Sequence, residues 1–154
     1  KDISERDYFA FALSNADKIC KKIEFEQKKS SNEMSDEEIA FMKENGFCGI
    51  KLHPDYQDFF IDEEKMFPIY EELEKQEMFV LMHCGEDVSF INSGKGNPSR
   101  TAKVLKKFPG LKFIAAHLGG YLRWNETLEH LVDFRNVWLD TAYCAFKPET
   151  ETKF

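Results

Sequence analysis

The chain has 154 residues, 42% of them hydrophobic, so a packed core is expected and intrinsic disorder is not. Its net charge of −7, without any basic stripe, argues against a nucleic-acid partner. Because no apolar run approaches the roughly 20 residues that cross a bilayer and no signal-peptide pattern opens the sequence, no membrane partner is expected.

Segments with helical and strand-like patterns alternate along the chain. Helices are indicated by apolar side chains at helical spacing, and strands by short apolar runs. In chain order, the predicted elements are a helix at 4–20, a short strand at 22–25, a helix opening at 35, a strand at 47–52, a helix around 66–73, a strand at 78–82, a helix opening at 97–98, a strand at 111–116, a helix at 125–134 and a strand at 137–139.

Several helix ends carry recognisable signals. The pattern Ser35-Asp-Glu-Glu38 is typical of a capping box, and Gly46 is a plausible stop for the helix that it opens. Asn97-Pro98 resembles an N-cap followed by proline at the first helical position, and Pro68 fits the first turn of its helix. Side chains expected to face inward on the helices at 35 and at 125–134 are Ile39, Met42, Leu128, Leu131 and Val132.

This order of elements, β-α-β-α-β-α-β, predicts a parallel α/β fold with right-handed crossovers. The run at 78–82 has no polar interruption, which indicates burial on both faces of the sheet. A closed (β/α)8 barrel takes about 250 residues, whereas this chain holds four to five βα units. We therefore interpret residues 1–154 as a single domain that is a partial (β/α)8 TIM-type barrel, a fragment of a longer chain or one part of an assembly.

Three of the four histidines, His53, His83 and His117, stand at the ends of strand-like runs. If the strands are parallel, all three imidazoles emerge at one edge of one sheet, where parallel barrels carry their catalytic groups. A single histidine at a strand end is usually structural, but three in register favour a shared site. Neutral imidazole is a good zinc ligand, and a second imidazole nearby can take a proton from water. One possibility is a site made by these three histidines alone.

Other residues near this edge have a functional and a structural interpretation. Arg100 and Arg123 follow histidine-bearing strands and could anchor a substrate carboxylate, although solvated helix-end arginines are commoner. Cys84 could be a thiol nucleophile paired with His117, but a buried, inert cysteine is the more usual outcome. Glu86 and Asp87 could orient an imidazole or could simply lie on the loop surface. The loop from 84 to 98 follows a strand end and should overhang the site.

Four segments resemble, in order and spacing, the second half of amidohydrolase-related metal-dependent hydrolases. They are Gly49-Ile-Lys-Leu-His-Pro54, His83-Cys-Gly85, Phe108-Pro-Gly-Leu-Lys-Phe-Ile-Ala-Ala-His-Leu-Gly-Gly120 and Asn136-Val-Trp-Leu-Asp-Thr141. The resemblance covers roughly residues 35–143. It implies a distorted (β/α)8 barrel in which these strands are the fourth to the seventh.

The resemblance also implies roles for residues. His83 matches the metal-binding histidine of the fifth strand, and His117 matches the sixth-strand histidine that binds a second metal or serves as the catalytic acid or base. Lys51 and His53 line the same edge without an assigned role. The His-x-His pair of the first strand and the aspartate of the eighth are missing from this sequence, and Asp140 on the seventh strand is not that aspartate.

These patterns together predict a metal-dependent hydrolase domain that uses one or two divalent ions, with zinc expected, and acts on a small-molecule substrate. Non-oxidative decarboxylation on the same scaffold is an alternative, as is a non-catalytic half-barrel that acts by association. The four scattered cysteines, without a Cys-x-x-Cys pair, favour reduced thiols in a cytoplasmic protein. Alone, the chain is expected to be inactive and to self-associate where barrel strands are missing.

Overall fold

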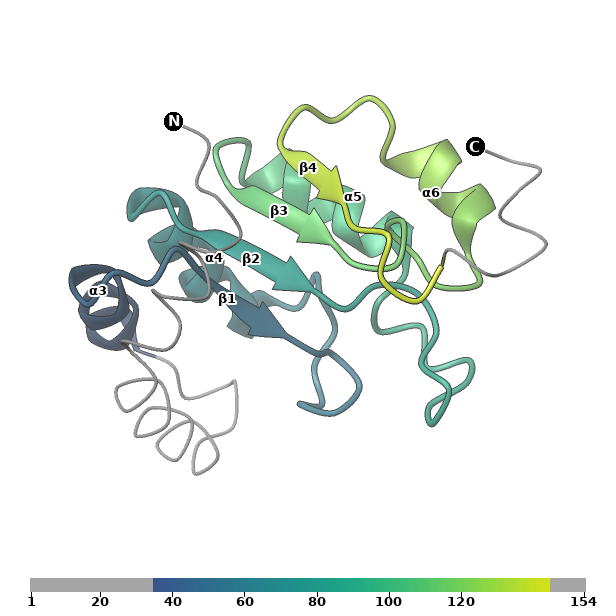
Figure 1. Ribbon diagram of the computed structural model, residues 1–154, viewed down its shortest axis with the longest axis horizontal. Helices are drawn as coiled ribbons and strands as arrows, with labels where there is room; N and C mark the ends of the chain where they lie inside the picture. Colours follow the sequence, from purple (N-terminus) through teal and green to yellow (C-terminus); the bar gives the residue numbers. More distant parts are fainter. Residues whose placement is uncertain (1–34, 145–154) are drawn as a thin grey trace, which may run out of the picture. The chain divides into compact units, whose positions relative to one another are not determined.

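The computed structural model describes residues 35–144, so the helix expected at 4–20 and the strand expected at 22–25 lie outside the described residues. Within 35–144, four parallel strands form one sheet in the order of the sequence (Figure 1). The strands are β1 (Gly49–Leu52), β2 (Phe79–Met82), β3 (Lys112–Ala115) and β4 (Val137–Leu139). The prediction of a parallel α/β fold is confirmed, with an open sheet that is consistent with part of a barrel.

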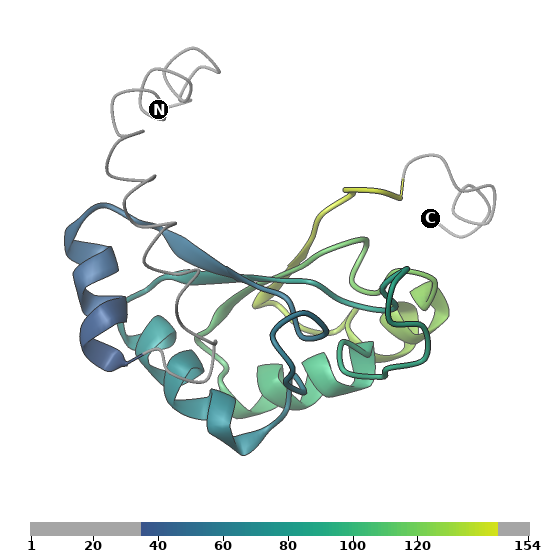
Figure 2. The same cartoon turned by 90° about the horizontal axis from the view of Figure 1, so that it is seen from below.

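Helices connect these strands and cover one face of the sheet (Figure 2). They are α3 (Asp36–Glu44), the 3-10 turn η2 (Glu64–Met66), α4 (Phe67–Lys75), α5 (Pro98–Lys107) and α6 (Trp124–His130). None of these helices is long and apolar enough to cross a membrane, within the part of the chain that the structure describes. In a (β/α)8 barrel, each strand is followed by a helix that packs on the outer face of the sheet, and the single helical layer seen here has this arrangement.

The core lies between the sheet and this helical layer. Along β2, Val80 and Met82 are fully buried, whereas Phe79 and Leu81 on the other face are only half-buried. Lys51, on the same face as Leu81 and paired with it in register, is exposed. The prediction that residues 78–82 are buried on both faces is therefore wrong for the described residues. An apolar run predicts the strand, but the burial of its second face depends on what packs there.

The helix starts predicted from local sequence signals agree with the structure. The Ser35 hydroxyl accepts a hydrogen bond from the Glu38 amide, and the Glu38 carboxylate accepts one from the Ser35 amide, which completes the predicted capping box. Gly46 follows the helix with φ of +82°. Asn97 does precede α5, but its side chain makes no capping hydrogen bond.

Helix α6 is shorter than predicted. It ends at His130, and of the three side chains expected to face inward only Leu131 is buried. Leu128 and Val132 are 39% and 60% exposed. With Leu131, Phe134, Val137 and Leu139 they line an apolar groove of about 290 Å³ between α6 and the edge strand β4. These apolar side chains do lie on one surface, as their spacing predicts. Because β4 is the last strand of the described sheet, only part of that surface is covered by other residues.

Gly85 joins the loop after β2 to the turn after β3. Its amide donates to the Gly96 carbonyl at 2.7 Å, and the flanking residues Cys84 and Glu86 exchange backbone hydrogen bonds with Tyr121 at 2.9 Å. Gly85 has φ of +91°, and a β-carbon there would collide with the Tyr121 backbone. This close approach of two backbones requires glycine.

We expect Gly85→Ala to destabilise the fold by more than about 3 kcal/mol, because it adds a backbone clash to an unfavourable φ. Gly46→Ala is the matched control: Gly46 also has positive φ, but nothing lies within 4 Å of a β-carbon there. Its cost should be only about 1–2 kcal/mol. Urea unfolding of both variants beside the wild type makes the comparison, and equal losses would show that the backbone approach at Gly85 is unimportant.

Candidate metal site at the carboxyl edge of the sheet

Three histidines meet at the carboxyl edge of the sheet. The strand ends Leu52, Met82 and Ala115 are aligned by register. The ladder continues one residue further, because the His83 amide donates to the Leu52 carbonyl and the Ala116 amide donates to the Met82 carbonyl. The His53 and His83 rings stack with centroids 3.9 Å apart and an interplanar angle of 14°, and the His83 and His117 centroids are 4.8 Å apart. The predicted convergence of the three imidazoles on one edge is confirmed.

Hydrogen bonds define which ring nitrogens carry protons. His117 Nδ1 lies 2.7 Å from the Ala142 carbonyl, which can only accept, so we assign the proton to Nδ1. His117 Nε2 is then an acceptor, and it faces His83 Nδ1 at 3.1 Å, which must donate. The proton of neutral His83 therefore sits on Nδ1, and its Nε2 keeps a free lone pair.

The lone pair of His83 is buried and available. His83 Nε2 has no hydrogen-bond partner among the described residues. Burial, and then the neighbouring His53 and His117, lower the pKa of His83 to about 4. The ring is thus neutral near pH 7, which is the state that a metal ligand requires.

Asp87 completes a cluster with two of these rings. Its Oδ2 lies 3.4 Å from His53 Nε2 and 4.0 Å from His83 Nε2. One ligand atom each of His53, His83 and Asp87 lie within 4.8 Å of one another, and among the described residues this is the set that could hold a metal ion. The third member is a carboxylate, whereas the sequence suggested His117. The loop-surface interpretation of Asp87 is wrong, because the residue is only 8% exposed.

Unpartnered buried atoms at this edge are compatible with a bound cation. Besides His83 Nε2, His53 Nδ1 and both carboxylate oxygens of Asp55 are buried without a hydrogen-bond partner in the described part of the chain. Burying a charge or a lone pair without a partner is costly, so such atoms call for a proton, a donor or a cation. Two imidazoles and a carboxylate are a donor set found in catalytic zinc sites.

Arg123 lies near this cluster but is already paired. Its Nε and Nη1 donate at 2.6 Å to the carboxylates of Glu86 and Glu126, and the hydrogen bond to Glu126 is the main cause that raises the Arg123 pKa. Glu86, like Asp87, is buried, so its predicted place on the loop surface is wrong. Glu86, Arg123 and Trp124 line a pocket of about 530 Å³. The guanidinium that could have met a substrate carboxylate is held by the protein's own acids.

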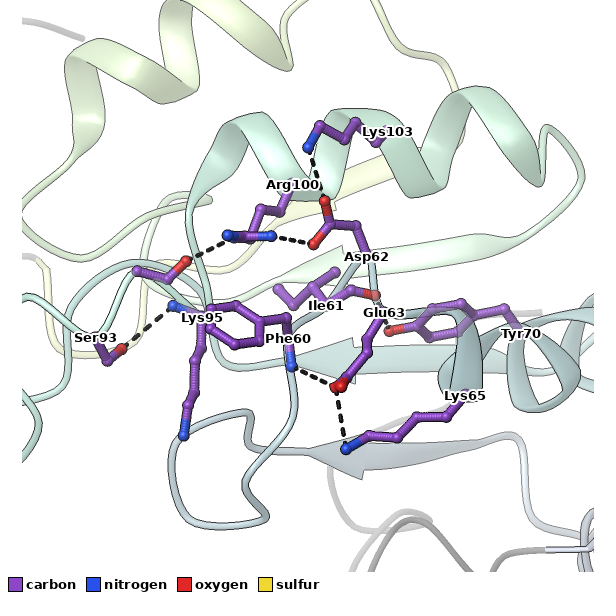
Figure 3. Close-up of polar contacts among 11 residues, drawn as sticks. Phe60, Ile61, Asp62, Glu63, Lys65, Tyr70, Ser93, Lys95, Arg100 and Lys103 are labelled. Atoms are coloured by element: carbon purple, nitrogen blue, oxygen red, sulfur yellow. Dashed lines mark hydrogen bonds and ion pairs between the residues drawn. The ribbon is translucent and has the colours of Figure 1, made fainter.

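Arg100 is likewise held by the protein, in a cluster with residues of the loops after β1 and β2 (Figure 3). It pairs with Asp62, donates to the Gly94 carbonyl at 2.9 Å and stacks 4.4 Å from the Phe60 ring centroid. Lys103 also contacts Asp62, at 2.8 Å. These contacts join the loop after β1 to the loop after β2. The structure does not bring Arg100 to the histidines, and it ties together the two loops that follow His53 and His83.

Lys51 and Cys84 show different environments. Lys51 is exposed on the face of the sheet away from the helices, yet partial desolvation by its surroundings lowers its pKa. Cys84 is fully buried, its sulfur lies 3.9 Å from the Thr101 hydroxyl, and burial raises its pKa to about 12. A thiol with that pKa is protonated near pH 7, which supports the inert rather than the nucleophilic interpretation.

Comparisons with known proteins agree with this architecture. A family model described as amidohydrolase matches residues 8–151. An uncharacterized TIM-barrel protein from Bordetella bronchiseptica is 17% identical with a TM-score of 0.54, over 73% of this chain and 40% of its own. A dihydroorotase from Campylobacter jejuni is 23% identical with a TM-score of 0.53, over 69% of this chain and 32% of its own. No curated protein matches. At this identity the structures establish the fold, and the chain spans less than half of either.

The Asp62 cluster makes stability depend on pH. Burial favours the neutral carboxyl, but hydrogen bonds and charges from Lys103 and Arg100 outweigh it and lower the Asp62 pKa below its ordinary 3.8. The stabilisation is therefore present above about pH 4 and is lost as pH falls through the lower folded pKa. We expect Asp62→Asn to be less stable than the wild type at pH 7, with the difference shrinking toward pH 2.5.

Urea unfolding at both pH values tests this expectation, with the exposed Asp133→Asn as control, for which we expect little change at either pH. A difference for Asp62→Asn that stays constant with pH would contradict the ionic role of the cluster.

Proposed function

The chain belongs to the amidohydrolase family, and from this premise we propose that it supplies the metal-binding edge of a metal-dependent hydrolase in which metal-activated water attacks an amide, ester or lactone-like carbon. The observation that carries the proposal is the buried, unpartnered Nε2 of neutral His83 beside the Asp87 carboxylate. A histidine that only packs in a core would normally satisfy both nitrogens.

We propose zinc as the ion, held by His83, Asp87 and His53. When bound, zinc lowers the pKa of its water to about 7, so a hydroxide nucleophile is available at neutral pH. Asp87 supplies a negative charge beside two neutral rings, which favours a cation at this point. His83 Nδ1 donates to His117, and such a bond fixes the orientation and tautomer of a metal-binding imidazole.

His117 is proposed as the proton acceptor. Its Nδ1 proton is held by the Ala142 carbonyl, so its basic nitrogen is Nε2. In the structure that nitrogen accepts from His83. We propose that entry of substrate and water replaces this hydrogen bond, so that the same lone pair can take the proton of the attacking water. The 530 Å³ pocket beside Glu86 is within the size range of small-molecule sites, and we propose that it receives part of the substrate.

We expect His83→Ala to weaken zinc binding by about 100-fold or more, because a ligand is lost and not only an outer contact. His117→Ala should retain zinc within about tenfold but slow turnover of the complete barrel by about 10²–10⁴-fold. His130→Ala, on α6, is the matched histidine control and should change neither. Zinc titration by calorimetry and steady-state kinetics give the readouts. Unchanged zinc affinity in His83→Ala would refute the proposed metal site.

A second candidate is a half-barrel that acts by association, and the apolar groove between α6 and β4 favours it. Leu139 on the edge strand is 40% exposed and lines this groove with the exposed Leu128 and Val132. Trp138, which is 52% exposed, alternates with Leu139 on the same strand and points to the other face of the sheet. Exposed strand edges and apolar patches are sites of association. We propose that further barrel strands cover this groove, and that without them the chain associates with itself.

Light scattering of the 154-residue chain should therefore give a mass above that of a monomer at micromolar concentration. Placing a charge in the groove, with Leu128→Lys and Val132→Lys together, should shift the chain toward monomer. Val88→Lys is the control, because Val88 is 66% exposed but lies on a loop outside the groove. A monodisperse wild-type monomer would exclude this second function.

A further inference from the structure

Asp140 directly follows β4, and its carboxylate contacts both the backbone of His117 and the segment that bonds to the His117 ring. One carboxylate oxygen, Oδ1, accepts from the His117 amide at 3.0 Å and from the Ala142 amide at 2.9 Å. The Ala142 carbonyl in turn accepts from His117 Nδ1 at 2.7 Å. A single oxygen therefore fixes the backbone of His117 and the peptide segment that holds the His117 ring.

The backbone at His117 needs such support. His117 and Leu118 have φ of +60° and +54°, a left-handed conformation that is unfavourable for residues with a β-carbon. Strain of this kind persists where the surroundings determine it and gathers at functional sites. Here the Asp140 carbonyl accepts from the Leu118 amide at 2.7 Å, and the Trp124 indole donates to the His117 carbonyl at 3.1 Å.

From this geometry we infer that Asp140 is a positioning residue: it holds the Ala142 carbonyl against His117 Nδ1, so that the His117 ring stays in the Nδ1–H tautomer with Nε2 turned toward His83. The inference rests on the proposed function only for what the Nε2 lone pair does. Without Asp140, the Ala142 carbonyl keeps, besides His117, the contact of the Cys144 thiol, a weak donor whose Sγ lies 3.4 Å away. A free imidazole in water favours the Nε2–H tautomer. Nε2 would then be a donor, and the match with His83 Nδ1–H would be lost.

The tautomer can be read directly from nitrogen chemical shifts. We would label the histidines of the full chain with ¹⁵N and record them at pH 8 with a chelator, in solution or in sedimented protein by magic-angle spinning. The wild type and Asp140→Asn should show His117 with its proton on Nδ1, because asparagine keeps the Oδ1 acceptor. Folded Asp140→Ala should show His117 mainly as the Nε2–H form. Asp133→Asn, at an exposed position, should match the wild type.

Amide exchange gives a second test that does not need Asp140→Ala to fold. The neutral amide of Asp140→Asn is a weaker acceptor than a carboxylate. Exchange at the His117 and Ala142 amides should therefore be several-fold faster than in the wild type. The Leu118 amide, which bonds to the backbone carbonyl of residue 140, is the internal control and should be unchanged.

Two results would overturn the inference: a wild-type His117 protonated on Nε2, or His117 and Ala142 exchange unchanged in Asp140→Asn. Neither readout involves zinc or turnover. A chain that bound no zinc but showed the expected tautomer would refute the proposed function and support the positioning role. Tight zinc binding with the wrong tautomer would do the reverse.

Discussion

Parallel pairing in register is the constraint on which the site depends. Leu52 pairs with Met82, and Met82 pairs with Ala115, so the chain leaves three strands at one level of one edge. A slip of one residue would turn the following side chain to the opposite face of the sheet. The stacking of His53 on His83 at 3.9 Å is thus a consequence of backbone pairing between segments that are distant in sequence. Gly85 also positions the loop after β2, because the absence of a side chain lets its backbone pack against that of Tyr121.

Closely packed imidazoles cannot all carry charge. Burial lowers the pKa of His53 and of His83, and the neighbouring His53 and His117 lower the pKa of His83 further. His53 and His83 are therefore neutral near pH 7, and the Asp87 carboxylate lies 3.4 Å from His53 Nε2 and 4.0 Å from His83 Nε2. Two parts of the fold therefore contribute differently to the site. The strands deliver the imidazoles, and the loop after β2 delivers the charge that makes the position attractive to a cation.

The sequence predicted well what depends on local pattern. The capping box at Ser35, the strand at 137–139 and the three histidines at strand ends are all read from neighbouring residues, and the structure places them as expected. It predicted poorly what depends on partners. Arg100 and Arg123 were candidate substrate anchors, but each is paired with carboxylates from distant segments, Asp62 and Glu86. The sequence gives no sign that the Asp87 carboxylate is buried, because loop carboxylates are usually exposed. The proximity of Asp87 to His83 was the one available clue.

The last strand of the described sheet, β4, both supports the histidine site and leaves apolar side chains exposed. Asp140 directly follows β4, and its carboxylate accepts from the amide of His117 in the strained turn after β3. The same strand also leaves Trp138 and Leu139 exposed, and Leu139 lines the groove beside α6. Both follow from a barrel architecture in which each strand needs a neighbour: β4 supports His117 because it lies next to β3, and its outer surface remains open because the described sheet ends there. The position of β4, next to β3 and without a described neighbour on its other side, thus accounts for both the support of His117 and the exposed apolar edge.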